Sequence, residues 1–170
     1  MKNKEFEELF ITQLETMLGA EKQILDTLPK LIKLAEIEDL KNALSTHLEE
    51  TENQVERLEQ IFRILNITPQ ARKNIAMEGI LKQGEELLKN KPQSPILDAA
   101  IIASAQMVEH CEIAIYGTLR SFAKHLKLDD EVADLLQETL KEEGAADKLL
   151  TKIADGSLFA SGINEEAASG

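Results

Sequence analysis

The sequence predicts an all-α domain folded as a four-helix bundle with a long crossover connection. Its 170 residues include only 8 glycines and 4 prolines, the two strongest helix breakers. Apolar residues recur at helical spacing in four long segments, and breakers separate these segments. A chain of this length can bury a substantial core as one domain. That core must be aliphatic, because tryptophan is absent and aromatic residues make up 4% of the chain.

Helical periodicity places the four long helices over residues 4–35, 40–65, 101–126 and 130–154. Between the second and the third, a connection of about 30 residues carries a short amphipathic helix near residues 76–88. Such a crossover can carry the chain along the length of the bundle, so the second and third helices are expected to run parallel. Pro29 should kink or interrupt the first helix. Residues 1–156 then form the bundle, and residues 157–170 are expected to be a flexible tail.

Carboxylates occupy positions on all four helices that otherwise carry apolar residues. Helical geometry places six acids and one amide on these stripes: Glu21, Glu50, Gln54, Glu109, Glu112, Glu143 and Asp147. Unpaired charge in an apolar core is costly, so positive counter-charge is expected there. Oxygen-rich ligation with little histidine suits Fe, Mn or Mg better than Cu or Zn, and carboxylates from four helices match a dinuclear centre. The alternative is a set of salt bridges, or acids at the stripe edges that are half exposed.

Other reactive side chains fall outside this set. His47, one turn before Glu50, could reach inward, but a place in the core or behind the ligands is favoured over ligation. Tyr116, one turn beyond Glu112, either belongs to the core or hydrogen-bonds a ligand carboxylate. Cys111 lies about 140° around the helix from the acids, and an inert small residue is favoured over a nucleophile there. The same helical angles place Glu15, Glu49 and Glu142 on outer faces.

The charge and hydropathy of the chain exclude some classes of partner. A net charge of −12 argues against binding to nucleic acid or to an anionic membrane. No apolar run reaches the length of about 18 residues that a membrane span needs, and the first residues lack the apolar region of a signal peptide. With one cysteine, no intramolecular disulfide can form. A soluble cytoplasmic protein is therefore expected.

Several short segments, within residues 6–154, carry a resemblance to a known family. They are Ala20-Glu21-Lys22-Gln23, His47-Leu48-Glu49-Glu50-Thr51, Ala76-Met77-Glu78-Gly79, Val108-Glu109-His110-Cys111-Glu112 with Tyr116-Gly117-Thr118-Leu119, and Glu138-Thr139-Leu140-Lys141-Glu142-Glu143. Through them the chain resembles the YciE/YciF stress-protein group of the ferritin-like superfamily and is similar in general plan to rubrerythrin. The resemblance implies a ferritin-like four-helix bundle, a di-iron site, association into dimers and a link to bacterial stress responses.

The resemblance also indicates how the acids would share two iron ions, with manganese as the other candidate metal. The Glu109 and Glu112 pair resembles the double glutamate of the third rubrerythrin helix. The expected terminal ligands are Glu21 and Glu112, the expected bridges are Glu50 and Glu143, and Glu109, Gln54 and Asp147 complete the ligand shells. The chain departs from the Glu-x-x-His pattern of the family's other two motif helices, because Gln54 and Asp147 follow Glu50 and Glu143 by four residues and neither is histidine. It also lacks the cysteine-rich, rubredoxin-like module that delivers electrons in rubrerythrins.

Two hypotheses of different classes follow. The first is a di-metal protein of the bacterial cytoplasm that supports oxidation of Fe(II) by peroxide or oxygen. The second is a non-enzymatic stress or scaffold bundle whose acids bind metal only structurally or not at all. A homodimer is expected in addition, because the crossover helix carries more apolar residues than a connecting strap needs. These residues are Ile75, Met77, Ile80, Leu81, Leu87 and Leu88.

Overall fold

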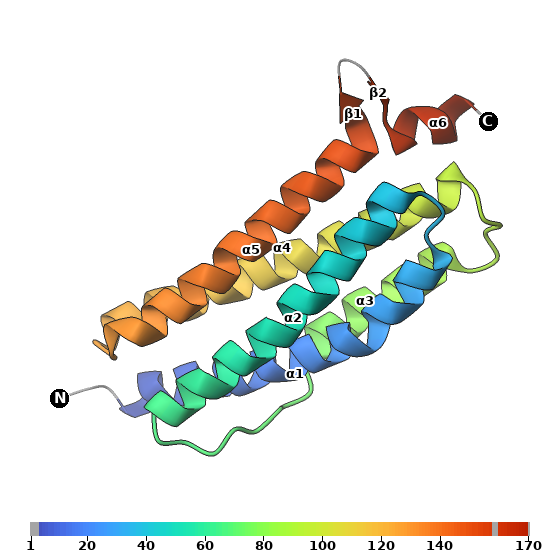
Figure 1. Ribbon diagram of the computed structural model, residues 1–170. Helices are drawn as coiled ribbons and strands as arrows, with labels where there is room; N and C mark the ends of the chain where they lie inside the picture. Colours follow the sequence, from blue (N-terminus) through green and yellow to red (C-terminus); the bar gives the residue numbers. More distant parts are fainter. Residues whose placement is uncertain (1–3, 158–159, 170) are drawn as a thin grey trace.

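The computed structural model describes residues 4–157 and 160–169, and four long helices form its bundle (Figure 1). They are α1 (Lys4–Leu34), α2 (Glu38–Ile64), α4 (Pro95–His125) and α5 (Asp130–Asp155). The predicted all-α, ferritin-like bundle is therefore confirmed. Helix α4 begins earlier than the periodicity indicated, because Pro95 occupies its first turn, where proline costs no hydrogen bond. Across the described residues, no helix combines the length and the apolar character that crossing a membrane requires.

The crossover contains the expected short helix, α3 (Ile75–Leu88), which packs against α1 and α4. Figure 1 shows α2 and α4 running in the same direction, as the long crossover requires. The start of α3 is capped by Asn74, whose side-chain oxygen accepts a hydrogen bond of 2.9 Å from the Met77 N–H. Met77 is buried, and Ile80, Leu81 and Leu88 are partly buried against the core, whereas Ile75 is 79% exposed and Leu87 is 36% exposed. Much of the apolar surface of α3 is therefore used within the chain, and the homodimer stays a prediction.

The segment between α2 and α3 covers one face of α1. The Arg72 N–H donates to the carbonyl oxygen of Glu15 (2.9 Å), and the Arg72 guanidinium pairs with the Glu15 carboxylate (2.8 Å). A Cβ on Gly19 would lie 1.9 Å from the Arg72 carbonyl oxygen, so only glycine permits this close approach. Helical angles placed Glu15 away from the apolar stripe of α1, and the residue is nevertheless buried, because the crossover passes over it.

The turn between α1 and α2 is held by an acid that the sequence did not single out. Asp98 on α4 is fully buried, and its two carboxylate oxygens accept hydrogen bonds from the backbone N–H groups of Glu36 (2.9 Å) and Ile37 (3.0 Å). These bonds satisfy donors near the start of α2 that would otherwise lack partners. Helix α1 continues through Pro29 to Leu34, so the proline does not interrupt the helix, which was one of the two effects expected of it.

The residues after α5 differ from the loosely held tail expected from the sequence. Strands β1 (Gly156–Ser157) and β2 (Ala160–Ser161) pair as a small antiparallel hairpin, and α6 (Ile163–Ser169) packs against α4 and α5. Ile163 is buried and anchors α6 to the bundle. Gly162 allows the turn, because a Cβ there would lie 2.3 Å from the Asp155 backbone. The hairpin thereby returns the chain onto the end of the bundle.

Candidate metal centre

Four buried acids and one buried histidine meet inside the bundle. Glu21 on α1, Glu109 and Glu112 on α4, and Glu143 on α5 are each at most 2% exposed. His47 on α2 is 5% exposed. One potential ligand atom from each of His47, Glu109, Glu112 and Glu143 lies within 4.8 Å of the others. These four residues come from α2, α4 and α5, and Glu21 adds α1 to the polar cluster through its interaction with Glu112.

His47 is the member of this cluster that the sequence-based ligand set left out. Its Nε2 atom lies 3.3 Å from Oε1 of Glu109. Its Nδ1 atom lies 3.9 Å from Oε2 of Glu50 and 4.0 Å from Oε2 of Glu143. The imidazole therefore stands among carboxylates from α2, α4 and α5. Its place one turn before Glu50, on the same helix face, was the signal that could have identified it.

Many polar atoms of the cluster are buried without a hydrogen-bond partner. Among the described residues these atoms are Glu21 Oε2, His47 Nδ1 and Nε2, Gln54 Oε1, Glu109 Oε2, Glu112 Oε1 and Oε2, and Glu143 Oε2. Buried polar groups in proteins almost always have partners, because leaving them unpaired costs free energy. The atoms are carboxylate oxygens, imidazole nitrogens and one amide oxygen, which are donor atoms for iron and manganese. The residues present therefore fit a bound divalent cation.

The electrostatics of the cluster also favour a positive group. Burial, reinforced by the charge of Glu143, raises the pKa of Glu21 to about 8 and the pKa of Glu109 to about 11. Burial likewise raises the pKa values of Glu112 and Glu143 above that of a free glutamate. In the absence of a cation, protons on these carboxyl groups must neutralise the cluster at neutral pH. A metal ion can displace these protons when it binds.

Two neighbouring side chains hold the candidate ligands in place. The hydroxyl group of Tyr116 donates a hydrogen bond to Oε1 of Glu21, and both residues are fully buried. Tyr116 thus serves both roles considered from the sequence, as a core residue and as a hydrogen-bond donor to a candidate ligand. On the opposite side, the Gln54 amide donates to Oε1 of Glu143. Gln54 therefore orients one carboxylate, and its own amide oxygen stays without a partner.

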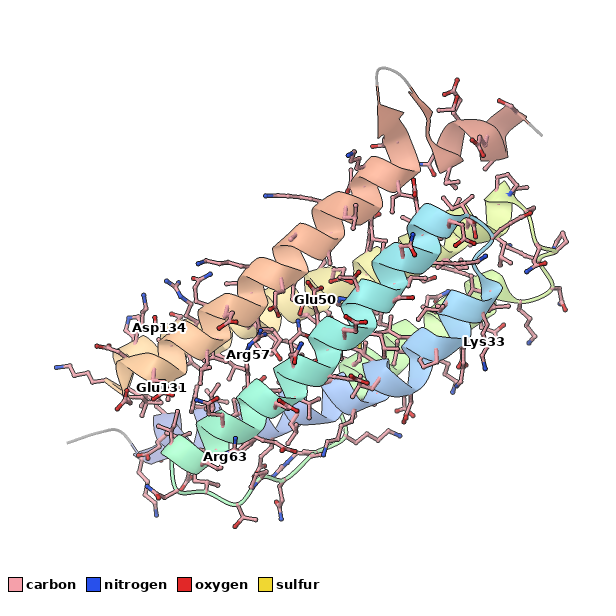
Figure 2. All side chains as sticks on the ribbon, viewed as in Figure 1. Lys33, Glu50, Arg57, Arg63, Glu131 and Asp134 are labelled. Atoms are coloured by element: carbon pink, nitrogen blue, oxygen red, sulfur yellow. The ribbon has the colours of Figure 1, made fainter. Side chains whose placement is uncertain are left out.

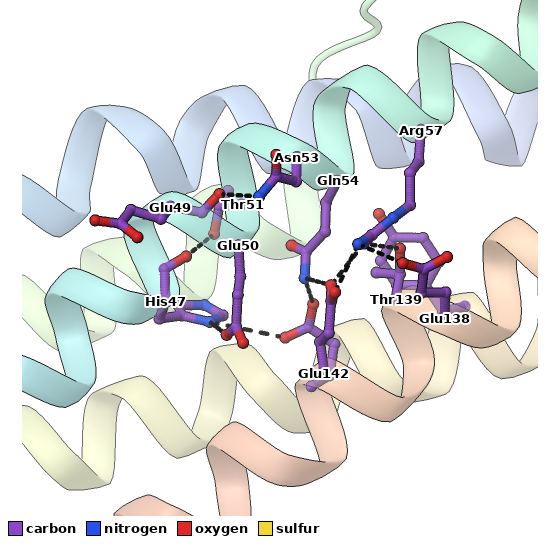
Figure 3. Close-up of polar contacts among 12 residues, drawn as sticks. His47, Glu49, Glu50, Thr51, Asn53, Gln54, Arg57, Glu138, Thr139 and Glu142 are labelled. Atoms are coloured by element: carbon purple, nitrogen blue, oxygen red, sulfur yellow. Dashed lines mark hydrogen bonds and ion pairs between the residues drawn. The ribbon is translucent and has the colours of Figure 1, made fainter.

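An arginine network lies beside the cluster, between α2 and α5 (Figure 3). Both terminal nitrogens of Arg57 lie 2.6 Å from the oxygens of Glu142, and one also donates to Glu138 at 3.0 Å. Gln54 donates a further hydrogen bond of 3.1 Å to Glu142. The expectation that Glu142 lies on an outer face is wrong, because its side chain turns toward α2 and pairs with Arg57. Arg57 thus neutralises Glu142, whereas the contact of Glu143 with a potential cation is that with His47, whose Nδ1 atom lies 4.0 Å from Oε2 of Glu143.

Two of the predicted ligands lie at the margin of the cluster. Glu50 is on the side of α2 that faces α5 (Figure 2), and its side chain is 31% exposed. Asp147 accepts a hydrogen bond of 3.2 Å from Gln106 and lies 3.4 Å from the exposed His110. The structure thus brings Glu21, Glu109, Glu112 and Glu143 together with His47, and leaves Glu50 and Asp147 outside the compact group.

Cys111 is not among the candidate metal ligands. The residue is half-buried on α4, and burial raises the pKa of its thiol. A raised pKa lowers the fraction of the reactive thiolate. This agrees with the inert thiol expected from the sequence.

A four-helix bundle with a long crossover and a carboxylate-rich core defines the class of ferritin-like proteins. The chain belongs to the family described as "Domain of unknown function (DUF892)", whose model matches residues 5–168. This is the family of the YciF stress protein, so the resemblance noted from the sequence is confirmed.

Known relatives agree with this assignment. The chain is 41% identical over 155 residues to protein YciF of Escherichia coli (strain K12), covering 91% of this chain and 93% of the relative. The crystal structure of the E. coli stress protein YciF superposes with a TM-score of 0.82 at 41% identity, covering 89% of this chain and 94% of that one. A structure of YcfI from Rhodopseudomonas palustris, suggested to be a structural protein, superposes with a TM-score of 0.84 at 42% identity and covers 88% and 94% of the two chains.

Proposed function

We propose that this protein binds two metal ions in the core of its bundle, with iron as the metal and manganese as the other candidate. The observation that carries the proposal is the set of buried oxygen and nitrogen atoms without hydrogen-bond partners. Such atoms come from all four bundle helices; those of His47, Glu109, Glu112 and Glu143 belong to the compact group, and Glu21 interacts with Glu112. A cation would pair them all at once, which no side chain among the described residues does.

The residues that would hold the ions are the compact group of His47, Glu109, Glu112 and Glu143, together with Glu21. Four carboxylates and one imidazole make an oxygen-rich donor set, which suits iron or manganese. Tyr116 and Gln54 keep two of these carboxylates oriented through hydrogen bonds. Asp147 is engaged with Gln106 and takes no direct part in the present arrangement.

The chemistry that bound iron supplies in such a centre is oxidation of Fe(II) to Fe(III) by peroxide or oxygen. Burial of the ligands limits the access of bulk water to the site. Glu21, whose pKa of about 8 in the metal-free chain is close to neutral pH, would release its proton when a metal ion binds. We place this activity in the bacterial cytoplasm as part of a stress response, in keeping with a relative described as a stress protein.

Two copies of the chain are proposed to associate into a homodimer, and light scattering at micromolar concentration measures this association.

A second candidate function is a structural protein of the stress response without catalytic metal chemistry. One relative of 42% identity is suggested to be a structural protein. The raised pKa values of Glu21 and Glu109 would allow protons, in place of a metal, to neutralise the cluster at neutral pH.

Metal analysis of protein purified without chelator separates these functions. Our proposal predicts about two ions per chain, as in the dinuclear carboxylate bundles. Fe(II) should then be added without oxygen, followed by peroxide, and Fe(III) formation should be followed by absorbance. Faster oxidation than in buffer supports the di-iron function. Bound metal without redox cycling supports a structural metal, and a chain that stays metal-free overturns the proposal.

A further inference from the structure

A cavity of about 100 Å³ lies between α2 and α5 beside the metal centre. Its polar lining consists of Thr46, His47, Glu50 and Glu109. The remaining wall is formed by three leucines and by three alanines, Ala43 on α2 and Ala145 and Ala146 on α5. These short side chains leave the helices with space between them where longer ones would fill it. The cavity therefore approaches the buried cluster from the side where Glu50 lies.

A second cavity, of about 440 Å³, adjoins the first on the side of solvent. The two share Ala43, Thr46 and Leu149 in their walls. Leu149 is 43% exposed, so this boundary lies near the surface. Asp39 and Lys152 belong to the outer cavity. The two cavities together lead from the surface of the bundle to the imidazole of His47.

Along this path from the surface, the Glu50 side chain comes first and the His47 side chain comes next. The Glu50 side chain is 31% exposed, whereas that of His47 is 6% exposed. Nδ1 of His47 lies 3.9 Å from the Glu50 carboxylate, and neither ring nitrogen has a hydrogen-bond partner. On the far side, Nε2 of His47 lies 3.3 Å from Glu109. A half-exposed acid, a buried unpartnered imidazole and a buried acid thus follow one another inward.

We infer that this path is the route by which the divalent cation enters, with Glu50 receiving the ion from solvent and His47 and Glu109 taking it into the centre. The inference rests on the proposed metal function and assigns Glu50 a transit role, where the sequence indicated a permanent bridge. A half-exposed carboxylate can replace part of an ion's hydration while other waters remain. The acids behind it draw a cation further inward.

The size of the cavities favours a cation on this route over another approach. His47 and Glu109 also border a cavity of about 20 Å³ on the side of α1, which continues toward α3 into one of about 40 Å³. Their walls are largely aliphatic, including Leu31, Leu81 and Val108. These cavities are smaller than the one beside Glu50, so an ion would have to lose more of its hydration to pass through them, which is costly. The wider path past Glu50 avoids that loss.

The rate of metal uptake tests the route separately from the metal site. Apo-protein is mixed with Fe²⁺ without oxygen, quenched with excess chelator after set times, and analysed for protein-bound iron. Ala43→Leu narrows the opening between the two cavities and should slow iron uptake several-fold. Leu149→Ala opens it at the surface and should quicken uptake. Glu50→Gln keeps the shape but removes the charge, and should slow uptake by about tenfold or more. Ala114→Leu, at an exposed alanine on α4, is the matched control and should load like the wild type.

Each outcome tests either the entry route or the proposed metal-binding function. All variants should reach the final iron content of the wild type, since the route affects the rate alone. If the three path variants load at the wild-type rate, the route is wrong although the metal centre stands. If Glu50→Gln lowers the final content by about one ion, Glu50 is a permanent ligand and its transit role is overturned. If Ala114→Leu slows uptake as much as Ala43→Leu, the route is again overturned. A wild-type protein that holds no iron at equilibrium refutes the proposed function itself. Leu149→Ala alters a surface position, so it keeps the test available if Ala43→Leu does not fold.

Discussion

Nε2 of His47 lies 3.3 Å from Oε1 of Glu109, which joins α2 to α4 across the centre of the bundle. Both side chains are almost completely buried, and in each at least one polar atom has no hydrogen-bond partner. An imidazole and a carboxylate at this distance can share a metal ion, or share a proton when no metal is bound. The pair therefore decides how the acidic core is neutralised.

Replacing His47 with alanine should weaken metal binding. The change removes the nitrogen donor of the compact group, so the affinity for Fe(II) or Mn(II) should fall by about tenfold or more, the loss that even a residue behind the ligands causes. Isothermal titration of chelator-treated protein with Mn(II) measures this. His110→Ala is the control, since the His110 side chain is 68% exposed and should leave the affinity unchanged. Equal affinity of the His47 variant and the wild type would exclude His47 as a ligand.

The four helices and most of the acidic core could be predicted from the sequence, because both follow from a 3.6-residue period. Glu21, Glu109, Glu112 and Glu143 sit at the centres of their apolar stripes, where helical geometry leaves only the interior. His47 could not be assigned in this way, because it lies at the edge of its stripe. Whether an edge residue faces inward depends on how α2 is rotated against α4 and α5, and periodicity does not define that rotation.

Contacts between segments that are distant in the sequence explain the other differences between the sequence-based predictions and the structure. Glu142 turns inward because Arg57, on a different helix, attracts it. Glu15 is covered because the crossover returns over α1, a long-range contact that no local pattern contains. The segment after α5 has too few apolar residues to show a period, and Ile163 anchors it only once the bundle offers a place to pack.

The metal-free protein should become less stable as the pH rises. Glu21 has a pKa of about 8 in the folded chain against an ordinary value of 4.5, and Glu109 has a pKa of about 11. Below the ordinary value these carboxyls are protonated in both states, so their stabilising contribution is complete. Between the ordinary and the raised pKa, unfolding releases a proton, and the free energy of unfolding falls by up to about 1.4 kcal/mol per pH unit for each such group.

Urea denaturation of chelator-treated protein between about pH 5 and pH 8 measures this decline. Metal-loaded protein should show the opposite trend, because the ions bind the deprotonated carboxylates more tightly at higher pH. A rise in the stability of the metal-free protein over this range would contradict the prediction.

Tyr116→Phe should destabilise the fold by about 1–3 kcal/mol, because it leaves a buried carboxyl oxygen of Glu21 without its donor. The loss of that donor should also raise the pKa of Glu21 further, since the hydrogen bond from Tyr116 favours the charged carboxylate. Chemical denaturation gives the free energy of unfolding. Thr118→Val removes an exposed hydroxyl and should change it by less than about 0.5 kcal/mol. Equal losses in the two variants would show that the bond to Glu21 contributes nothing particular.

Arg57 and Glu142 should be energetically coupled. Two hydrogen bonds of 2.6 Å join them, and the Arg57 side chain is only 15% exposed, so a double-mutant cycle with Arg57→Ala and Glu142→Ala should give about 1–3 kcal/mol. The Lys41 and Glu38 pair, which is exposed within one helix, should give less than about 0.5 kcal/mol. A coupling no larger than that of the exposed pair would mean that the bidentate contact is not kept in solution.

Adjacent glutamates on α5 should differ sharply in their effect on metal content. Glu143 is fully buried among the candidate ligands, and its Oε2 atom has no hydrogen-bond partner. Glu143→Ala should therefore remove at least one of the two ions. Glu142 is already neutralised by Arg57, so Glu142→Ala should leave the metal content unchanged while it lowers stability. Metal analysis and urea denaturation of both variants separate the two effects. Loss of metal in the Glu142 variant and its retention in the Glu143 variant would place the ions on the other side of α5.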